Sequence, residues 1–135
     1  PMPSRARLYC VPPSMCSEFW PHVEPMLRGA ERTRLLDLET VRRDVCEGDG
    51  LLWLAYGDGI EGAATTALQR VAGHLYCVIT ACGGVGLDHW ITLIEGIESY
   101  AKAEGCKAVR IVGRKGWRRK LRDYAVTNYV MERTL

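Results

Sequence analysis

The fold is decided by the stretch from His74 to Gly113, which reads HLYCVITACGGVGLDHWITLIEGIESYAKAEGCKAVRIVG. It opens with an apolar run of strand length, passes a glycine-rich turn at Cys82–Gly86 and continues into a helical pattern. The apolar residues of that pattern share one helical face: Trp90, Leu93, Ile94, Ile97 and Ala101. Gly105 is a natural helix stop, and the next strand follows it at Lys107–Gly113. A strand, a helix and a strand within about 35 residues predict a right-handed parallel crossover.

Ahead of this unit the sequence predicts a strand, two helices and an antiparallel meander. The first strand is Arg7–Val11, and a helix runs toward Leu27 with a break near Pro25. Gly29–Arg34 is polar and is expected to be a loop. Asp37 is a good cap for a second helix, whose apolar face comprises Leu38, Val41 and Val45. The meander strands are Leu51–Tyr56, Ile60–Val71 and His74–Ala81, and the turns between them are Gly57–Gly59 and Ala72–Gly73.

Behind the crossover we expect one short helix and one closing strand. The helix covers Lys115–Tyr124, with Trp117, Leu121 and Tyr124 on its buried face, and the strand covers Asn128–Leu135. The predicted fold class is therefore α/β (or α+β), in one domain spanning residues 1–135. Its sheet is mixed and mostly antiparallel, with about six strands and three to four helices.

Composition excludes several classes of protein. Of the 135 residues, 47% are apolar and 25% are charged, as in ordinary globular domains. These values exclude a disordered chain, a collagen-like chain and a coiled coil. No apolar run approaches the length of a transmembrane helix, and the first residues lack the apolar core of a secretory signal.

Basic residues gather in one segment, although the net charge is only +2. Seven of the thirteen residues from Arg110 to Arg122 are basic. Arg114, Arg118 and Arg122 recur with helical spacing and form one stripe of the last predicted helix. The stripe is either a weak contact for the phosphates of coenzyme A or nucleic acid, or a solvated helix face. We favour the solvated face, because no aromatic residues interrupt the stripe.

The six cysteines follow no disulfide or zinc pattern. No C-x-x-C pair occurs, and most of the cysteines stand within apolar strand or helix patterns. The three histidines, His22, His74 and His89, form no spaced set of metal ligands. We therefore expect reduced core cysteines in an intracellular protein, and Cys77 and Cys82 are interpreted as core residues and not as nucleophiles.

The order of these elements resembles the GNAT superfamily of acyl-CoA-dependent N-acyltransferases. The resemblance covers nearly the whole chain and is strongest from Leu51 onward. In that family a loop of the form Arg/Gln-x-x-Gly-x-Gly/Ala and the start of the next helix hold the pyrophosphate of coenzyme A. Gly84-Val85-Gly86 stands in the matching place, and Ile91–Gly105 looks like the family's amphipathic helix. The resemblance thus implies a cofactor cradle at Gly83, Gly84, Val85 and Gly86, with Arg114 nearby.

Other positions depart from the family pattern. The leading Arg/Gln falls on Ala81, which has no side-chain donor. The family often has an asparagine and, seven residues later, a tyrosine that protonates the departing thiolate. Aligning Tyr124–Val126 with the family's Leu-Gly-Phe corner places Arg114 and Leu121 at these two positions. Another register gives Tyr124 the tyrosine role, but it breaks the alignment of that corner.

The candidate catalytic residues are therefore Glu61 and Tyr124. A general base in this family often lies on a central strand, and Glu61 is the carboxylate within the long second meander strand. The alternative for Glu61 is a solvent-facing position beside the hairpin. For Gly83–Gly86 the alternative is a plain tight turn, because one G-x-G is a weak signal. His89 is either a contact for a bound anion or a surface residue, and we favour the surface position.

A narrower resemblance is to small GNAT-like proteins encoded in the structural gene clusters of tailed phages and prophages. It rests on Trp20-Pro21 with Pro25, Leu52-Trp53-Leu54 and Gly113–Trp117. It implies a non-enzymatic structural or binding component of a virion, with other protein subunits as partners. The alternative is an acetyl-CoA-dependent N-acyltransferase acting on an amine. We expect no cofactor in the first case and acetyl-CoA in the second, in the host cytoplasm or on the virion.

Overall fold

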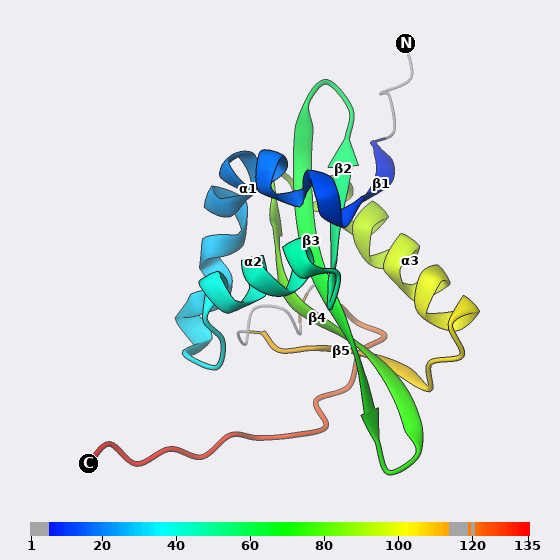
Figure 1. The fold of residues 1–135 in the computed structure, drawn as a ribbon. Helices are drawn as coiled ribbons and strands as arrows, with labels where there is room; N and C mark the ends of the chain where they lie inside the picture. Colours follow the sequence, from blue (N-terminus) through cyan, green and yellow to red (C-terminus); the bar gives the residue numbers. More distant parts are fainter. Residues whose placement is uncertain (1–5, 114–118, 120) are drawn as a thin grey trace.

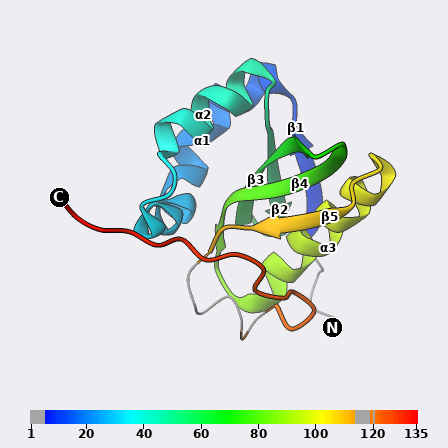
Figure 2. The ribbon, with the colours of Figure 1, turned by 90° about the horizontal axis from the view of Figure 1, so that it is seen from below.

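A five-stranded sheet lies between two layers of helices (Figures 1 and 2). The computed structural model describes residues 6–113, 119 and 121–135, and it describes residues 87–90 by their main chain alone. The strands of this part are β1 (Arg7–Val11), β2 (Leu51–Tyr56), β3 (Ile60–Val71), β4 (His74–Gly84) and β5 (Ala108–Ile111). Their order is sequential, with antiparallel pairing from β1 to β4 and parallel pairing between β4 and β5. The predicted mixed, mostly antiparallel fold class is confirmed.

The helices divide between the two faces of the sheet. One face carries α1 (Pro13–Leu27), the 3-10 helix η1 (Arg28–Thr33) and α2 (Leu38–Glu47), and the other carries α3 (Leu87–Ala103). Strand alternation supplies a core to each layer. In β2, Leu52 and Leu54 pack under α1 and α2, whereas Trp53 and Ala55 pack under α3. The sheet is therefore buried on both faces at its centre.

Local sequence signals place α2 and α3 correctly. The Asp37 side chain accepts a hydrogen bond from the Glu39 N–H at the start of α2, and the predicted apolar face of that helix is buried. The α3 residues Leu93, Ile94, Ile97 and Ala101 are buried against the sheet. Gly105, with φ of 80°, ends the α3 segment, and β5 then pairs with β4 in parallel. The predicted crossover is confirmed.

Helix α1 departs from the prediction at its end. It continues through Pro25 to Leu27 and passes directly into η1, where a loop was expected. Pro21 and Pro25 lack the N–H that an α-helix uses, and short 3-10 turns with i→i+3 bonds are frequent at the ends of α-helices. Arg34, with φ of 58°, then ends η1. Among the described residues, no helix has both the length and the apolar character needed to cross a membrane.

The predicted closing strand at Asn128–Leu135 is wrong. Residues 125–135 form no strand, so the described sheet has five strands in place of about six. Strand-like alternation alone cannot form a strand, because the backbone also needs a neighbouring edge to pair with. The predicted helix Lys115–Tyr124 lies mostly outside the described residues. Its described end is a turn in which the Tyr124 N–H donates to the Leu121 carbonyl at 3.1 Å.

Candidate functional site

The candidate site is the splay between β4 and β5, where the two strands part. Their pairing runs from Tyr76 opposite Ala108 to Ile79 opposite Ile111 and then ends. β5 stops there, whereas β4 continues to Gly84. Among the described residues, no strand therefore pairs with β4 beyond Ile79 on the β5 side. Such openings at the carboxyl ends of parallel strands are common places for ligands.

A bulge in β4 marks the start of the splay. Thr65 lies opposite Ala81 and Thr66 lies opposite Ile79, so Thr80 is an extra residue. The Thr65 and Thr80 hydroxyls are hydrogen-bonded at 2.7 Å, and Thr80 also contacts the Thr65 carbonyl at 3.2 Å. A bulge bends and twists its strand, which accounts for the parting of β4 from β5.

A second hydrogen bond supports the bulge from beneath. The indole N–H of Trp53 donates to the Thr66 hydroxyl at 3.0 Å in the buried core. Thr65 and Thr66 are the two buried polar residues of the described part of the chain. Both hydroxyls are hydrogen-bonded, so neither is buried without a partner. The consecutive threonines in an otherwise apolar strand were the sequence signal for this feature, which the sequence analysis did not use.

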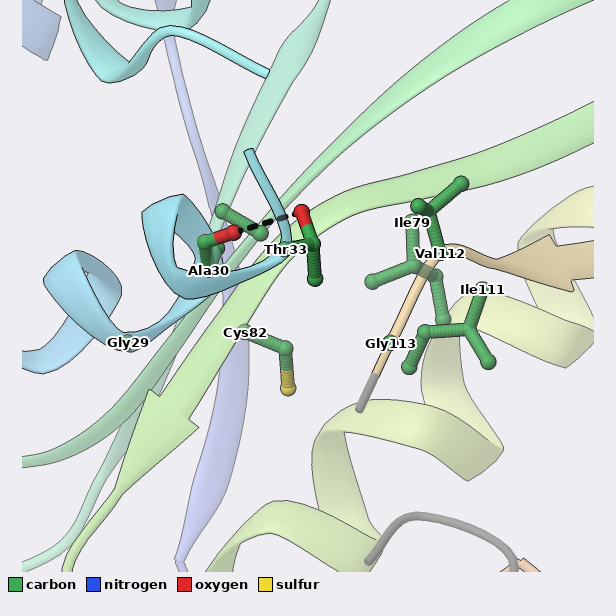
Figure 3. Close-up of a pocket in the computed structure, with 9 residues that line it drawn as sticks. Gly29, Ala30, Thr33, Ile79, Cys82, Ile111, Val112 and Gly113 are labelled. Carbon is green, nitrogen blue, oxygen red and sulfur yellow. Dashed lines mark hydrogen bonds between the residues drawn. The ribbon is translucent and has the colours of Figure 1, made fainter. Parts of the chain in front are cut away.

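A small pocket opens in the splay (Figure 3). Its walls come from three elements: Gly29, Ala30 and Thr33 of η1, Ile79, Ala81 and Cys82 of β4, and Ile111, Val112 and Gly113 at the end of β5. Its volume is ≈ 20 Å³, about the space that one water molecule needs. The Thr33 hydroxyl donates to the Ala30 carbonyl and accepts from the Leu35 N–H, so its donor hydrogen is already used. The described walls therefore offer an apolar ligand very little room.

Gly83 and Gly84 belong to β4 and not to a loop, which corrects the expected boundary of the glycine-rich turn. A Cβ on Gly83 would overlap the Met26 carbonyl at the end of α1. A Cβ on Gly84 would lie 2.7 Å from the Glu61 carbonyl oxygen. Close packing of α1 and β3 thus requires both glycines, whether or not they bind a ligand.

One main-chain N–H of the predicted cradle is already hydrogen-bonded within the sheet. The Val85 N–H donates to the Glu61 carbonyl at 2.8 Å and extends the β3–β4 ladder by one step. Because bonded and non-bonded pairs alternate in such a ladder, the Gly84 N–H points away from β3, toward the splay. Gly86, with φ of 85°, precedes α3, and no side-chain cap is described at the start of that helix. One strand N–H and the first turn of α3 are thus the main-chain groups available to an anion.

The described residues do not fit coenzyme A as a whole. The main-chain groups beside Gly86 suit an anion, but Ala81 is buried, has no side-chain donor and lines a pocket of only ≈ 20 Å³. The predicted contact Arg114 lies outside the described residues, as does Arg118. Arg122 is exposed. The proposed basic stripe therefore stays a prediction.

Glu61 lies on β3, whereas the pocket lies on the opposite side of the glycine segment, between β4 and β5. A Cβ on Gly57 would lie 2.8 Å from Glu61 Oε1, so the partly buried carboxylate rests against the β2–β3 turn. Glu61 is not among the residues that line the splay pocket. The Glu61 carbonyl accepts the hydrogen bond of the Val85 N–H, and the catalytic role of the Glu61 carboxylate stays a prediction.

Tyr124 is held on the α3 face of the molecule. Its hydroxyl donates to Glu98 Oε2 at 2.8 Å, and its ring packs against the apolar cluster under α3. Burial, followed by the hydrogen bond and charge of Glu98, raises the pKa of Tyr124 well above its usual value. A phenol with a raised pKa is a weaker acid, and Tyr124 does not line the splay pocket.

All six cysteines are free thiols, but they differ in exposure. Cys16, Cys77 and Cys82 are buried, whereas Cys10 is exposed. Burial raises the pKa of Cys77 to about 11 and that of Cys82 to about 12. A thiol with such a pKa is protonated at neutral pH and is a poor nucleophile. These values support the interpretation of Cys77 and Cys82 as core residues.

The histidines do not gather at the splay. His74 is exposed at the tip of the β3–β4 hairpin, while the side chain of His89 lies outside the described part. Among the described residues, no three His, Cys, Asp or Glu side chains are placed to share a metal ion. The contribution of η1 to the pocket wall was also missed, because nothing in the sequence of a polar loop indicates which strand it covers.

Comparison with solved structures identifies this arrangement of sheet and helices. The chain has the GNAT fold. It is similar to a GNAT family acetyltransferase of Staphylococcus aureus, with a TM-score of 0.66 and 12% identity over 98% of this chain and 100% of the other. An aminoglycoside acetyltransferase from an uncultured soil metagenomic sample, solved with sisomicin, gives a TM-score of 0.63 at 13% identity, over 96% and 95% of the chains.

A protein described as a transcriptional regulator from Bacillus halodurans is as similar, with a TM-score of 0.66 and 14% identity over 96% of this chain and 99% of the other. No protein-family model and no curated protein matches the chain. At these identities the likeness to the GNAT proteins concerns the fold, and the activity has to be argued from the residues of the splay.

Proposed function

We propose that this chain is a GNAT-fold binding protein that does not transfer acyl groups and serves as a subunit of a protein assembly. One observation carries the proposal. In the splay, the described residues of η1, β4 and the end of β5 leave a cavity of only ≈ 20 Å³. A thioester and its carrier chain are far larger than the single water molecule that such a cavity holds.

The candidate catalytic residues support the same proposal. The Tyr124 hydroxyl donates a hydrogen bond to Glu98, and Tyr124 is not among the residues that line the pocket. The Glu61 carboxylate rests against the β2–β3 turn. General acid–base catalysis needs the acid and the base within hydrogen-bond reach of one reacting centre. These two groups share no pocket in the described part of the chain.

For the kind of assembly, our proposal is a tailed-phage particle, with other structural proteins as partners and the virion or the host cytoplasm as location. Its support is the resemblance of Trp20-Pro21, Leu52-Trp53-Leu54 and Gly113–Trp117 to phage-encoded GNAT-like proteins. Neighbouring genes test this part directly. Capsid and tail genes on both sides are expected, and a position within a metabolic operon would contradict it.

An acetyl-CoA-dependent N-acyltransferase is the second candidate. The observation that favours it is the start of α3, beside the splay. Gly86 precedes this helix and no side-chain cap is described there, so the first N–H groups of α3 can bind a phosphate. In this case Arg114 would supply a further phosphate contact, and an amine would be the acceptor.

Calorimetric titration with acetyl-CoA separates the two candidates. We expect no binding, or binding too weak for a micromolar Kd, at physiological salt. The acetyltransferase of Staphylococcus aureus with the same fold is the parallel control for the ligand. A micromolar Kd that Arg114→Ala weakens and Arg119→Ala leaves unchanged would contradict the proposal and support the acyltransferase.

A further inference from the structure

Part of the sheet face on the side of α1 and α2 extends beyond these helices. β3 pairs with β2 as far as Thr66, and the β3–β4 hairpin then continues to its turn at Ala72 and Gly73. In Figure 1 this arm of the hairpin reaches past α2. The register of β3, β4 and β5 arranges the residues of this face in three rows, which are Ala67–Val78–Arg110, Gln69–Tyr76–Ala108 and Val71–His74. We call this face the platform.

The platform is open to solvent. Cys77 and Val109 pack in the apolar cluster under α3, so the residues that alternate with them project from the opposite face. In the described part of the chain, no platform residue belongs to either apolar cluster or packs against one. Gln69 and Ala108 are exposed, and Val71 is 41% exposed. The described helices therefore leave this face uncovered.

An arginine lies over a tyrosine in the middle of the platform. The guanidinium carbon of Arg110 is 3.7 Å from the centroid of the Tyr76 ring. The ring supports one side of the cation, and the short side chains of Ala67 and Ala108 leave room around the other. Neither of the two ion pairs of the described residues involves Arg110. Its N–H groups can therefore donate to a ligand while a planar base stacks on the guanidinium.

The distribution of charge favours a polyanion at this end of the sheet. Residues 62–87 and residues 105–122 contain no Asp or Glu, and the second range contains eight Lys and Arg. Residues 18–49, which include η1, α2 and most of α1, contain eight acidic and five basic residues. A chain of phosphates is therefore attracted to β5 and the sequence around it and is repelled by the acidic helices.

We propose that the platform binds single-stranded nucleic acid, with one base stacked on Arg110 and the phosphate chain along β5. Single strands bind to open sheet faces that combine stacking groups with cations. Gln69, beside Tyr76 in the same row, supplies an amide that can hydrogen-bond the edge of a base. A duplex keeps its bases paired inside, and an acidic protein matches the charge but not the planar stack. This activity goes beyond the proposed role in an assembly and does not depend on it.

Fluorescence anisotropy with the full chain tests the binding. The probes are labelled oligothymidylate and oligouridylate, which separate DNA from RNA as the source of the single strand. We expect a micromolar Kd at low salt for at least one of them, weakening as salt is added, and weaker binding of a duplex of the same length. Three results overturn the proposal: no binding of either probe, equal binding of the duplex, or equal displacement of the probe by polyglutamate, which would indicate an acidic protein as the partner.

Two substitutions of Arg110 separate stacking from charge. Arg110→Gln should raise the Kd about five- to hundredfold, the range for the loss of one stacked base. Arg110→Lys keeps the charge without the planar group, and it should also raise the Kd. Arg43→Gln removes the same charge from the exposed surface of α2 and is the matched control, which should leave the Kd unchanged. Full affinity of Arg110→Lys, or equal effects of the two Arg→Gln changes, overturns the assigned stack.

A substitution at an exposed position tests the platform without touching the stacked pair. Ala108→Glu places a carboxylate beside Arg110 and Tyr76 and should raise the Kd at least as much as Arg110→Gln does. Ala103→Glu makes the same change on the exposed surface of α3, on the other side of the sheet, and is the control. Unchanged far-UV circular dichroism shows that both variants are folded. Equal Kd values for the two variants overturn the proposal, because the probe would then bind elsewhere.

Discussion

The Tyr124 hydroxyl donates a hydrogen bond of 2.8 Å to Glu98 Oε2. The bond joins a residue beyond β5 to the middle of α3, across 26 positions of the sequence. It therefore fixes the start of the C-terminal segment against the helix layer. It also places a carboxylate beside a phenol, so ionisation of the phenol would set two negative charges against each other in a half-buried place.

We predict that this contact makes the protein less stable at high pH. The folded pKa of Tyr124 is raised, so folding favours the protonated phenol. Its contribution to the free energy of unfolding is complete below about pH 10, where unfolded tyrosine starts to ionise, and falls as the pH rises further. Urea titrations from neutral pH upward should show that the free energy of unfolding declines less at alkaline pH for Tyr124→Phe than for the unchanged chain. Tyr129→Phe changes an exposed ring and is the control. Identical alkaline profiles for Tyr124→Phe and the unchanged chain would contradict the role of this contact.

Substitution of Gly83 should destabilise the fold through packing. The new Cβ of Gly83→Ala would overlap the Met26 carbonyl, so α1 has to move from β4. Overpacking of this kind typically costs about 1–3 kcal/mol. Gly59→Ala is the matched control, since its Cβ would meet nothing within 4 Å. Chemical denaturation measures both, and equal stabilities would show that α1 does not press on this glycine.

The hydrogen bond beneath the bulge predicts a coupled pair of substitutions. Thr66→Val leaves the buried indole N–H of Trp53 without its acceptor, which typically costs about 1–3 kcal/mol. Trp53→Phe removes the donor, so the double variant should lose less stability than the two single losses added together. A double-mutant cycle by urea denaturation measures the coupling. Strict additivity would mean that the bond contributes nothing.

The predictable parts of the fold were those specified by neighbouring residues. Ala72 and Gly73, with φ of 51° and 81°, form the expected turn, and the glycine marks it because glycine adopts a positive φ without steric cost. The apolar spacing of α3 likewise determined which face is buried. The consecutive threonines marked the position of the Thr65–Thr80 contact, but the partner depends on strand register across 15 residues, which no local pattern contains.

The candidate site was harder to predict because its signals were ambiguous. Glycine after a strand indicates either a phosphate-binding turn or a close approach of backbones, and Gly83 and Gly84 make the close approach whether or not they also bind a ligand. The position of Tyr124 depended on the choice between two alignments. Its partner Glu98 was not among the candidates, because a carboxylate on an amphipathic helix ordinarily faces solvent.

The cysteines should separate into protected and accessible thiols. Burial raises the pKa of Cys82 to about 12, so little thiolate forms at pH 8, and the side chain is also shielded. Cys10 is exposed at the sheet edge and should react with iodoacetamide much faster than Cys82, as peptide mapping would show. All six should react at similar rates in guanidinium, which controls for peptide recovery. Equal native rates for Cys82 and Cys10 would contradict the buried position.

The final prediction concerns Leu121 and Trp117, which the sequence places on the buried face of the predicted helix Lys115–Tyr124. Leu121 is 8% exposed and belongs to the apolar cluster under α3, so Leu121→Ala should cost about 2–5 kcal/mol. Trp117 lies outside the described residues, and the same pattern predicts about 3–5 kcal/mol for Trp117→Ala. Such losses are a large part of the total stability of a domain, so thermal unfolding should begin many degrees lower. Arg122→Ala, on the exposed side, is the control and should change stability by less than about 0.5 kcal/mol.

A severe effect at Leu121 with a mild one at Trp117 would mean that the tryptophan is exposed. A large exposed aromatic residue next to the C-terminal segment would then be a contact for a partner.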